Sequence, residues 1–277
     1  MVYPLEPGDV DYYPVKVGSM LLTMVDPNRG FEKAYNRWYE RDHFYDGCMV
    51  GPFMFAGSRW VAPRELKDLR WPHGDTVANP WDAGSYVSIY WVEEGHHKEH
   101  FDDWAGPNVF GLYANGRGFS ERTHIHTVVM DHVGHDSYRD DDPVPLALAL
   151  DHGYPGIVVA WFDGRDQMPA ADLHARLTER LVPELLAGSS IESASSWTPS
   201  TPDAGPRQGP MPLGTEGGSR NRLVQLFFVA GDPRDTTKRL RDYTDAVEQA
   251  GLADTLLVAP FYRTVVGTDT YVDQLWQ

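Results

Sequence analysis

One histidine in the first part of the chain stands at the end of an aromatic stripe. A helical pattern carries Tyr35, Trp38, Tyr39 and His43, whose spacing of one to four residues places them on one face of a helix. A titratable group beside aromatic walls is typical of a small-molecule pocket. The same pattern also fits core packing, with the histidine only closing the helix end. We predict that His43 is the general acid or base of such a pocket.

Two further histidines lie two residues apart in an alternating stretch. The alternation predicts a strand, on which His124 and His126 would point to the same face. They would then stand near His43 and relay or position a proton, unless they lie on the solvent face of an edge strand. Zinc or iron is an alternative, with Asp131, His132 or His43 as a third ligand. Because nothing in the spacing fixes that ligand, no metal site is predicted.

Hydroxyl and aromatic side chains on the neighbouring elements complete the predicted pocket. Tyr39 and Tyr90 would hydrogen-bond a developing oxyanion. The residues predicted to bind substrate are Trp38, Phe55, Arg59, Trp60 and Trp91. Aromatic strand residues are usually packing, but around a cavity they favour an aromatic or polycyclic ligand.

A second histidine cluster, in the stretch EEGHHKEH, has a less suitable setting. His96 and His100 lie one helical turn apart, but their neighbours are acidic and polar, so we expect a solvated helix face. The glutamate is misplaced for the HExxH zinc signature. The chain also lacks a GxGxxG turn, a phosphate-binding loop and a GxSxG elbow, which argues against nucleotide, flavin and serine-hydrolase chemistry.

Composition excludes several classes of protein. The chain has 277 residues, of which 42% are hydrophobic, enough for a folded core. Its formal net charge of -16 disfavours nucleic acid as a partner and favours an uncharged or weakly charged substrate. The one cysteine, Cys48, cannot form an internal disulfide, and neither a signal peptide nor a membrane-spanning apolar run is recognisable. We expect a soluble, cytoplasmic protein.

The chain order predicts two sets of strand, helix, strand, strand, helix, strand. Residues 1–17 are typical of an extended arm, and an acidic, proline-bearing linker at 136–145 separates predicted halves at 18–137 and 138–277. The elements predicted in the first half are a strand at 20–25, a helix at 31–43, strands at 53–62 and 85–92, a helix at 93–104 and a strand at 122–133. Those in the second half are a strand at 156–162, a helix at 169–187, strands at 191–197 and 222–230, a helix at 235–251 and a strand at 256–266. Residues 198–219, rich in Pro, Gly, Ser and Thr, predict a long mobile loop.

This order resembles the dimeric α+β barrel superfamily in a tandem form. The resemblance implies an α+β fold of two ferredoxin-like (βαββαβ) halves packed as a pseudo-dimer. The first half most resembles EthD-like proteins, through the apolar strand at 20–25 and the segment Trp38-Tyr39-Glu40-Arg41-Asp42-His43. The proline–glycine pair expected after the histidine is found reversed, as Gly51-Pro52, and the second half has no counterpart of His43. We therefore expect one working pocket, in the first half.

The superfamily includes cofactor-free monooxygenases, polyketide cyclases, lyases, isomerases and haem proteins such as chlorite dismutases, among which fold does not choose. Our main prediction is a cofactor-independent acid–base enzyme of the lyase, isomerase or cyclase type, acting on a hydrophobic aromatic or carbonyl-bearing small molecule. The alternatives are a cofactor-free monooxygenase, in which a base ionises a phenol for reaction with oxygen, and a non-catalytic binding protein. A haem would find only His152 and His174 as axial ligands in the second half. The chain is expected to be a monomer (pseudo-dimer) or, through exposed edge strands and its arm, a homodimer.

Overall fold

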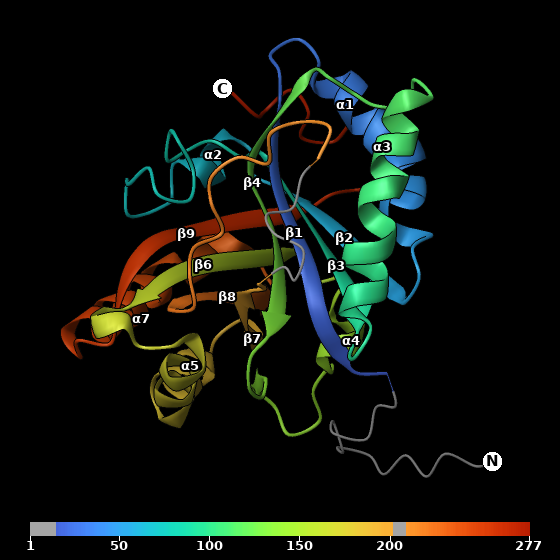
Figure 1. The fold of residues 1–277 in the computed structure, drawn as a ribbon. Coiled ribbons are helices and arrows are strands. Elements are labelled where there is room, and N and C mark those ends of the chain that lie inside the picture. Colours follow the sequence, from blue (N-terminus) through green and yellow to red (C-terminus); the bar gives the residue numbers. More distant parts are fainter. Residues whose placement is uncertain (1–14, 202–208) are drawn as a thin grey trace.

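An antiparallel β-barrel with helices packed outside it forms the body of the protein in a computed structural model that describes residues 15–201 and 209–277 (Figure 1). The strands are β1 (Val17–Pro27), β2 (Met54–Val61), β3 (Tyr86–Glu93), β4 (Arg122–His132), β5 (Ser137–Tyr138), β6 (Gly156–Gly164), β7 (Ile191–Pro199), β8 (Arg222–Val229) and β9 (Ala253–Arg263). The predicted arm at 1–17 lies almost wholly outside the described residues.

The longer helices follow the strands in the order that the sequence predicted, whereas the short helices α2 and α4 were not predicted. The helices are α1 (Glu32–Trp38), η2 (Tyr39–Met49), α2 (Arg64–Lys67), η3 (Lys98–Ala105), α3 (Gly106–Ala114), α4 (Leu146–Ala149), η4 (Arg165–Gln167), α5 (Ala170–Glu179), α6 (Leu181–Leu186), η5 (Pro233–Thr236) and α7 (Thr237–Gln249). The segments η2 and η3 are π-helices, while η4 and η5 are 3₁₀-helices. No helix in these residues is long and apolar enough to cross a membrane.

The strands close on themselves. Their order is β4-β1-β3-β2-β9-β6-β8-β7, and β7 returns to pair with β4, while β5 extends β7 at the side. The two junctions between the halves are short, with Trp60 opposite Arg263 at one and His132 opposite Trp197 at the other. The expectation of exposed edge strands at the ends of the two halves is therefore wrong, because these strands pair with each other at the two junctions.

The barrel interior holds the largest apolar cluster. Its members come from alternate positions of strands in both halves and include Met20, Leu22, Met24, Trp60, Ile89, Trp91, Trp161, Trp197, Leu226, Phe228 and Phe261. The indoles of Trp91 and Trp197 stack with centroids 4.9 Å apart, across the junction between β4 and β7. Burial of this surface is the main force that holds the two halves together.

The outer faces of the two halves differ. Figure 1 places α1 and α3 on one side of the strands and α5 and α7 on the other. Under α5, α6 and α7 the outer face is filled by a second apolar cluster, to which the four leucines predicted at helical spacing all belong, namely Leu173, Leu177, Leu181 and Leu185. The predicted single helix at 169–187 breaks at Arg180, whose backbone is not helical (φ -147°, ψ -52°).

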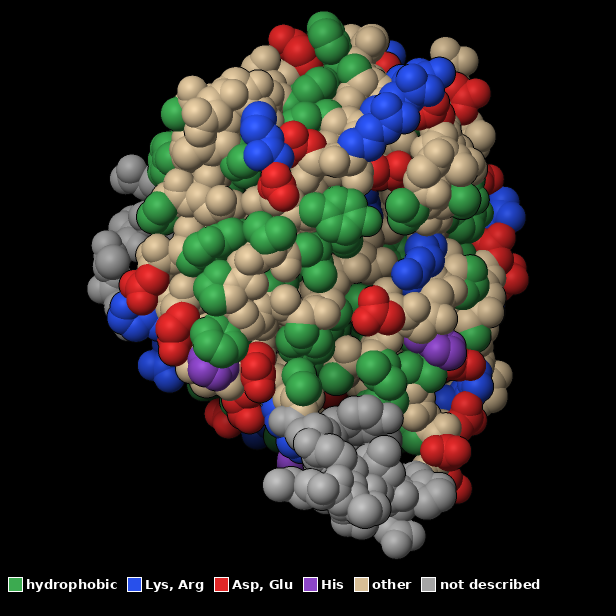
Figure 2. All heavy atoms as spheres, turned by 90° about the vertical axis from the view of Figure 1, so that its right-hand side faces the viewer, with side chains coloured by type: hydrophobic (Ala, Val, Ile, Leu, Met, Phe, Trp, Pro, Cys, Tyr) green, Lys and Arg blue, Asp and Glu red, His purple; other side chains and the backbone are tan. Residues whose placement is uncertain are grey.

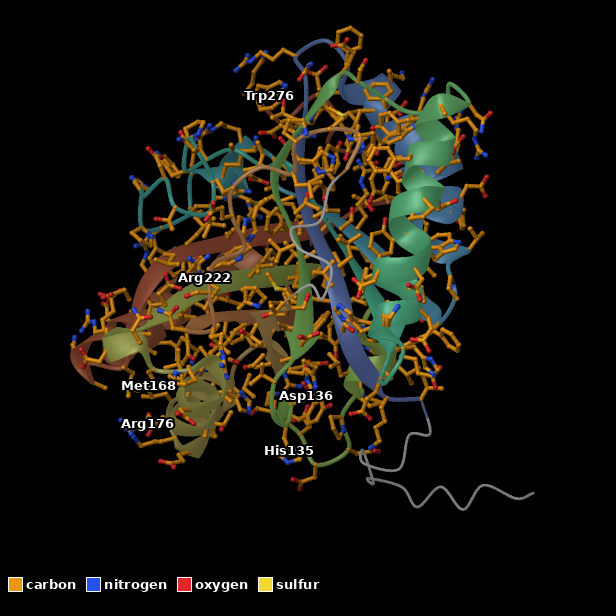
Figure 3. The ribbon with its side chains drawn as sticks, viewed as in Figure 1. His135, Asp136, Met168, Arg176, Arg222 and Trp276 are labelled. Carbon is orange, nitrogen blue, oxygen red and sulfur yellow. The ribbon has the colours of Figure 1, made fainter. Side chains whose placement is uncertain are left out.

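The first helix of the chain is longer than the sequence predicted. It starts at Glu32, as α1, and continues without interruption as the π-helix η2 to Met49, so His43 lies inside it and not at its end. The last residues of the chain return to the start of this helix. The indole N–H of Trp276, which is labelled near the top of Figure 3, donates to Glu32 at the start of α1 (2.6 Å).

Candidate functional site

A cavity of about 190 Å³ lies on the outer face of the first half, between the strands β1 and β4 and the helices η2, η3 and α3. Its floor is formed by the outward-facing side chains of the two strands, among them Thr23, Arg122, His124 and Thr127. A segment of the second half, residues 209–213, covers it. The equivalent face of the second half is packed with leucines under α5 and α6, and the expectation of one working pocket in the first half stays a prediction.

The walls of the cavity come from the two π-helices. Tyr39, His43, Gly47 and Cys48 of η2 line it on one side, and η3 contributes His100 and other residues on the opposite side. The i→i+5 bonding of a π-helix widens each turn, so residues four or five apart share a face. Long π-helical stretches are rare and are found mostly at functional sites.

His43 is held by stacking and not by hydrogen bonds. Its ring lies 4.6 Å from that of Trp38, nearly parallel, and meets the ring of Tyr39 edge-on at 5.4 Å. Gly47 backs the imidazole so closely that a Cβ there would lie 2.4 Å from Nδ1. Burial lowers the pKa of His43 to about 3, and the positive charge of Arg122 acts in the same direction. His43 is thus a neutral imidazole at physiological pH, facing the cavity with the capacity to accept a proton.

His124 has both ring nitrogens occupied. Its Nδ1 is 2.7 Å from the hydroxyl of Thr127, and its Nε2 accepts a hydrogen bond from Nε of Arg122 (3.3 Å). The arginine can only donate, so the neutral ring carries its hydrogen on Nδ1 and donates it to Thr127. Burial lowers the pKa of His124 to about 3. Because its acceptor nitrogen is already in use, His124 is arranged to position Arg122 and not to take a proton.

His126 does not reach the cavity, and the expectation that it shares a face with His124 is wrong. A β-bulge puts His124 opposite Val25 but His126 opposite Met24, so Ile125 is the extra residue and the alternation is broken. His126 is 0% exposed and points into the barrel interior, where its Nδ1 bonds to Thr215 (2.8 Å). Burial lowers its pKa to about 3.

Tyr39 and Tyr90 form a hydrogen-bonded pair behind the cavity wall. Their hydroxyl oxygens are 2.6 Å apart, and Cys48 lies in the same buried cluster as Tyr90. Burial raises the pKa of both phenols and raises that of Cys48 to about 12, so all three groups are protonated at neutral pH. Only Tyr39 and Cys48 of the three line the cavity. Of the two tyrosines, Tyr39 is therefore the one in contact with the cavity.

The predicted substrate-binding residues are mostly elsewhere. Trp60 and Trp91 are 0% exposed inside the barrel, on the opposite face of β2 and β3, and Phe55 sits at a bulge of β2 and packs against that interior. Aromatic identity does not reveal which face of a strand a residue occupies, which is why these three assignments fail. Arg59 lies over the rings of three tyrosines and lines a smaller cavity of about 80 Å³, while Trp38 supports His43.

Two residues of the cavity were missed in the sequence. Arg122 is the first residue of the predicted strand at 122–133 and carries no motif. His100 was expected on a solvated helix face, but it is 2% exposed, lines the cavity and donates from Nδ1 to the carbonyl of Pro52 (2.8 Å). Its partner in that expectation, His96, does lie at the surface, stacked on Phe53. The glycine at position 51 is the sequence feature that is consistent with a buried His100, because a Cβ there would lie 2.3 Å from the His100 ring.

A haem does not fit the cavity that holds His43. The cavity of about 190 Å³ is smaller than the roughly 300–1,000 Å³ of ordinary ligand pockets, and a porphyrin is a large ligand. In the second half, Nε2 of His174 is pressed against Gly134, where a Cβ would lie 2.2 Å away, and the ring of His152 packs on Tyr154. In the described part of the chain, no group of three or more His, Cys, Asp or Glu residues is arranged to hold a metal ion.

Comparisons with known proteins give a fold. No protein-family model and no curated protein sequence matches the chain. Among solved structures, an anthrone oxidase-like protein is similar over 96% of this chain and 98% of its own, with a TM-score of 0.52 and 8% identity. A proposed monooxygenase from Fusobacterium nucleatum covers 89% of this chain and 92% of its own (TM-score 0.50, 9% identity). A proposed chlorite dismutase is similar over 92% of this chain and 97% of its own, with a TM-score of 0.50 and 9% identity.

These neighbours correct the main prediction. All three are enzymes of oxidative or chlorite chemistry by description, which agrees with the expectation of an enzyme, but none is a lyase, isomerase or cyclase. The prediction of a cofactor-independent lyase, isomerase or cyclase is therefore wrong, and the oxygenase alternative is better supported. At 8–9% identity the likeness extends to fold alone. The chain thus has an antiparallel barrel closed from one chain with helices outside it, and this is the dimeric α+β barrel fold of these neighbours.

Proposed function

We propose that the protein is a cofactor-independent oxygenase that converts a small hydrophobic phenol into a quinone with molecular oxygen. The observation that carries the proposal is His43, a neutral imidazole that faces an apolar cavity and has no hydrogen bond or ion pair among the described residues. Such a group is free to take a proton from a bound ligand. The volume of about 190 Å³ suits a ligand of one or two rings, smaller than the polycyclic molecule that the sequence suggested.

The reaction balances without a reductant. The phenol O–H bond breaks, and its proton goes to the imidazole of His43. A ring carbon of the phenolate forms a bond to oxygen, and the resulting peroxide takes the proton back. The ring C–H proton is then lost as the O–O bond breaks, which leaves a second carbonyl on the ring and releases water. One oxygen atom stays in the product and the other leaves as water, so one O₂ is consumed for each quinone formed.

The remaining side chains of the cavity would orient the phenol. Tyr39, held by Tyr90, is placed to donate a hydrogen bond to the substrate oxygen. His124 would hold Arg122 in place. His126, inside the barrel, has no part in this proposal.

Oxygen uptake tests the proposal. Single-ring and two-ring phenols are supplied in a closed oxygen-electrode cell, and quinone is measured in parallel, with one labelled oxygen atom expected per product from ¹⁸O₂. His43→Ala should lower kcat by roughly 10²–10⁴-fold, the usual contribution of a general base. His96→Ala is the matched control, because His96 is a histidine of the same half that stacks on Phe53 away from the cavity. Uptake that is equal in both variants, or no uptake with any phenol, would refute it.

Several finer expectations belong to the same proposal. The strand orders β4-β1-β3-β2 and β9-β6-β8-β7 support two ferredoxin-like halves at 18–137 and 138–277. The EthD-like resemblance of the first half rests on the strand and helix around His43. A homodimer is supported by apolar side chains gathered on the face of α1 and α3, seen in Figure 2, where Tyr45, Val50 and Phe110 are exposed. A cytoplasmic location and the mobility of residues 198–219 stay predictions.

A further inference from the structure

The cavity contains a buried arginine that has no carboxylate partner among the residues that the structure describes. Arg122 is 5% exposed, and its Nε and Nη1 donate to His124 (3.3 Å) and to the backbone carbonyl of Phe119 (3.2 Å). Its guanidinium lies over the ring of Trp38, 4.5 Å from the centroid. These are neutral acceptors and an aromatic face. Within residues 15–201 and 209–277, no acidic side chain forms an ion pair with it.

This lack of a partner does not come from a shortage of carboxylates. With 40 Asp and Glu against 24 Lys and Arg, carboxylates are in excess. Nearby Arg117 shows the ordinary arrangement, since it pairs with both Asp42 and Asp46. A buried charge without a counter-ion is costly, and proteins normally pair it or use it.

The groups around the guanidinium do not neutralise it. His43 and His124 are both uncharged, and the positive charge of Arg122 is among the causes that lower the pKa of each. The hydroxyls of Thr23 and Thr127 on the floor are neutral and bond to each other (2.8 Å). The cavity is thus an apolar chamber with a net positive charge at one wall.

We propose that the substrate is held in this cavity as an anion, a phenolate whose oxygen pairs with Arg122. The inference deepens the proposed function and rests on it for the class of molecule. A phenol enters uncharged, which agrees with the negative charge of the whole protein, and becomes charged only beside the guanidinium. The O–H bond breaks, the proton passes to His43, and the two positive groups then flank one negative oxygen. Pairing with that oxygen offsets the repulsion between Arg122 and the protonated imidazole.

4-Nitrophenol is a suitable probe, because its phenolate absorbs visible light and its phenol does not. The wild-type protein is titrated with it at a pH well below the pKa of the free phenol. The bound fraction should show the phenolate band, with the apparent pKa of the bound phenol lowered by at least one unit, a tenfold or greater preference for the anion. Nitrobenzene, which cannot ionise, serves as the neutral probe of the same shape.

Three variants separate the charge from the fold. Arg122→Met keeps an apolar side chain over Trp38 and should bind nitrobenzene as the wild type does. Its preference for the phenolate over the phenol should disappear. Arg122→Lys should retain part of the preference. Arg37→Gln, the control, removes a charge that is exposed and paired with Asp269, and should leave the preference unchanged.

The outcomes distinguish the two proposals. Binding of 4-nitrophenol only as the neutral phenol by the wild-type protein, no binding of it at all, or an unchanged preference in Arg122→Met would each overturn the anion site. An anion preference that depends on Arg122, in a protein that consumes no oxygen with any phenol, would keep the anion site and remove the oxygenase. If Arg122→Met does not bind nitrobenzene, the test rests on Arg122→Lys, which keeps the positive charge. Complete loss of the preference for the phenolate in Arg122→Lys would then contradict the inference.

Discussion

Gly47→Ala is the sharpest test of how the structure positions His43. Gly47 lies within η2, with a backbone that any residue adopts, so alanine there should by itself favour the helix by about 0.5–1 kcal/mol. Its new Cβ would however lie 2.4 Å from Nδ1 and 2.6 Å from Cε1 of His43. The imidazole has to move, because the methyl group is fixed to the helix backbone.

The size of the effect follows from these distances. An ordinary contact begins at 3.4 Å, so the ring must shift by about 1 Å and slide over Trp38. A displacement of about 1 Å at a catalytic group costs roughly 10²-fold in rate. Overpacking destabilises the protein by about 1–3 kcal/mol, and the higher helix propensity of alanine offsets part of this loss. The free energy of unfolding should therefore fall by no more than about 2 kcal/mol.

Kinetics and stability are measured on the same preparations. The expected result is a kcat/KM for phenol oxidation lowered by roughly 10²-fold in a protein that unfolds in urea close to the wild type. Gly111→Ala in α3 is the matched control, because nothing lies within 4 Å of a Cβ at that helical position, and it should keep full activity. Full activity in Gly47→Ala would show that the position of His43 does not matter to the reaction.

Three further changes have definite outcomes. The pKa values of His43, His124 and His126 are each lowered from 6.5 to about 3, so the stability that these neutral rings contribute is complete above pH 6.5 and is lost as the pH falls towards 3. The free energy of unfolding should fall by about 1.4 kcal/mol per pH unit for each ring, or about 4 kcal/mol per pH unit for the three together. Urea unfolding at pH 7, 6 and 5 measures this slope, and a flat profile would contradict the burial of these rings. Trp91→Ala should lower the free energy of unfolding by about 3–5 kcal/mol, because Trp91 is buried inside the barrel. The affinity of the folded protein for nitrobenzene should not change, and weaker binding would mean that Trp91 lines the pocket. Met211→Ala should open the roof and shift kcat/KM towards two-ring phenols by about tenfold, whereas an unchanged preference would mean that residues 209–213 do not limit the ligand.

Local patterns predicted the elements well but not the faces of the strands. The order of strands and helices and the apolar leucine face of α5 and α6 follow from periodicity and from turn residues, which act over a few positions. The bulge at Ile125 is different, because a single extra residue reverses every later side chain and has no sequence signature here. That one residue explains why His126 was placed in the pocket and Thr127 was not.

The helix that carries His43 shows the same limit. The stripe includes Tyr39 as a neighbour of the imidazole, because side chains four residues apart also meet on an α-helix, whereas the stack of Trp38 on His43 spans five residues and depends on the π-helix. The π-helical turn, which brings Gly47 behind the ring, was not predictable from α-helical spacing. Arg122 could not be recognised either, since its importance lies in a missing partner, and partners come from residues distant in the chain.

The closed barrel built from one chain has two outer faces with separate sequences. When two identical subunits make such a barrel, every substitution appears on both faces, so a residue that improves one cleft changes the other as well. Here the two faces are encoded independently. One could be filled with leucine at no cost to the other, and the freed half supplies residues 209–213 as a cover over its neighbour's cavity. Two independent sequences can thus divide the work, with one half packed for rigidity and the other left with the cavity that we propose to be reactive.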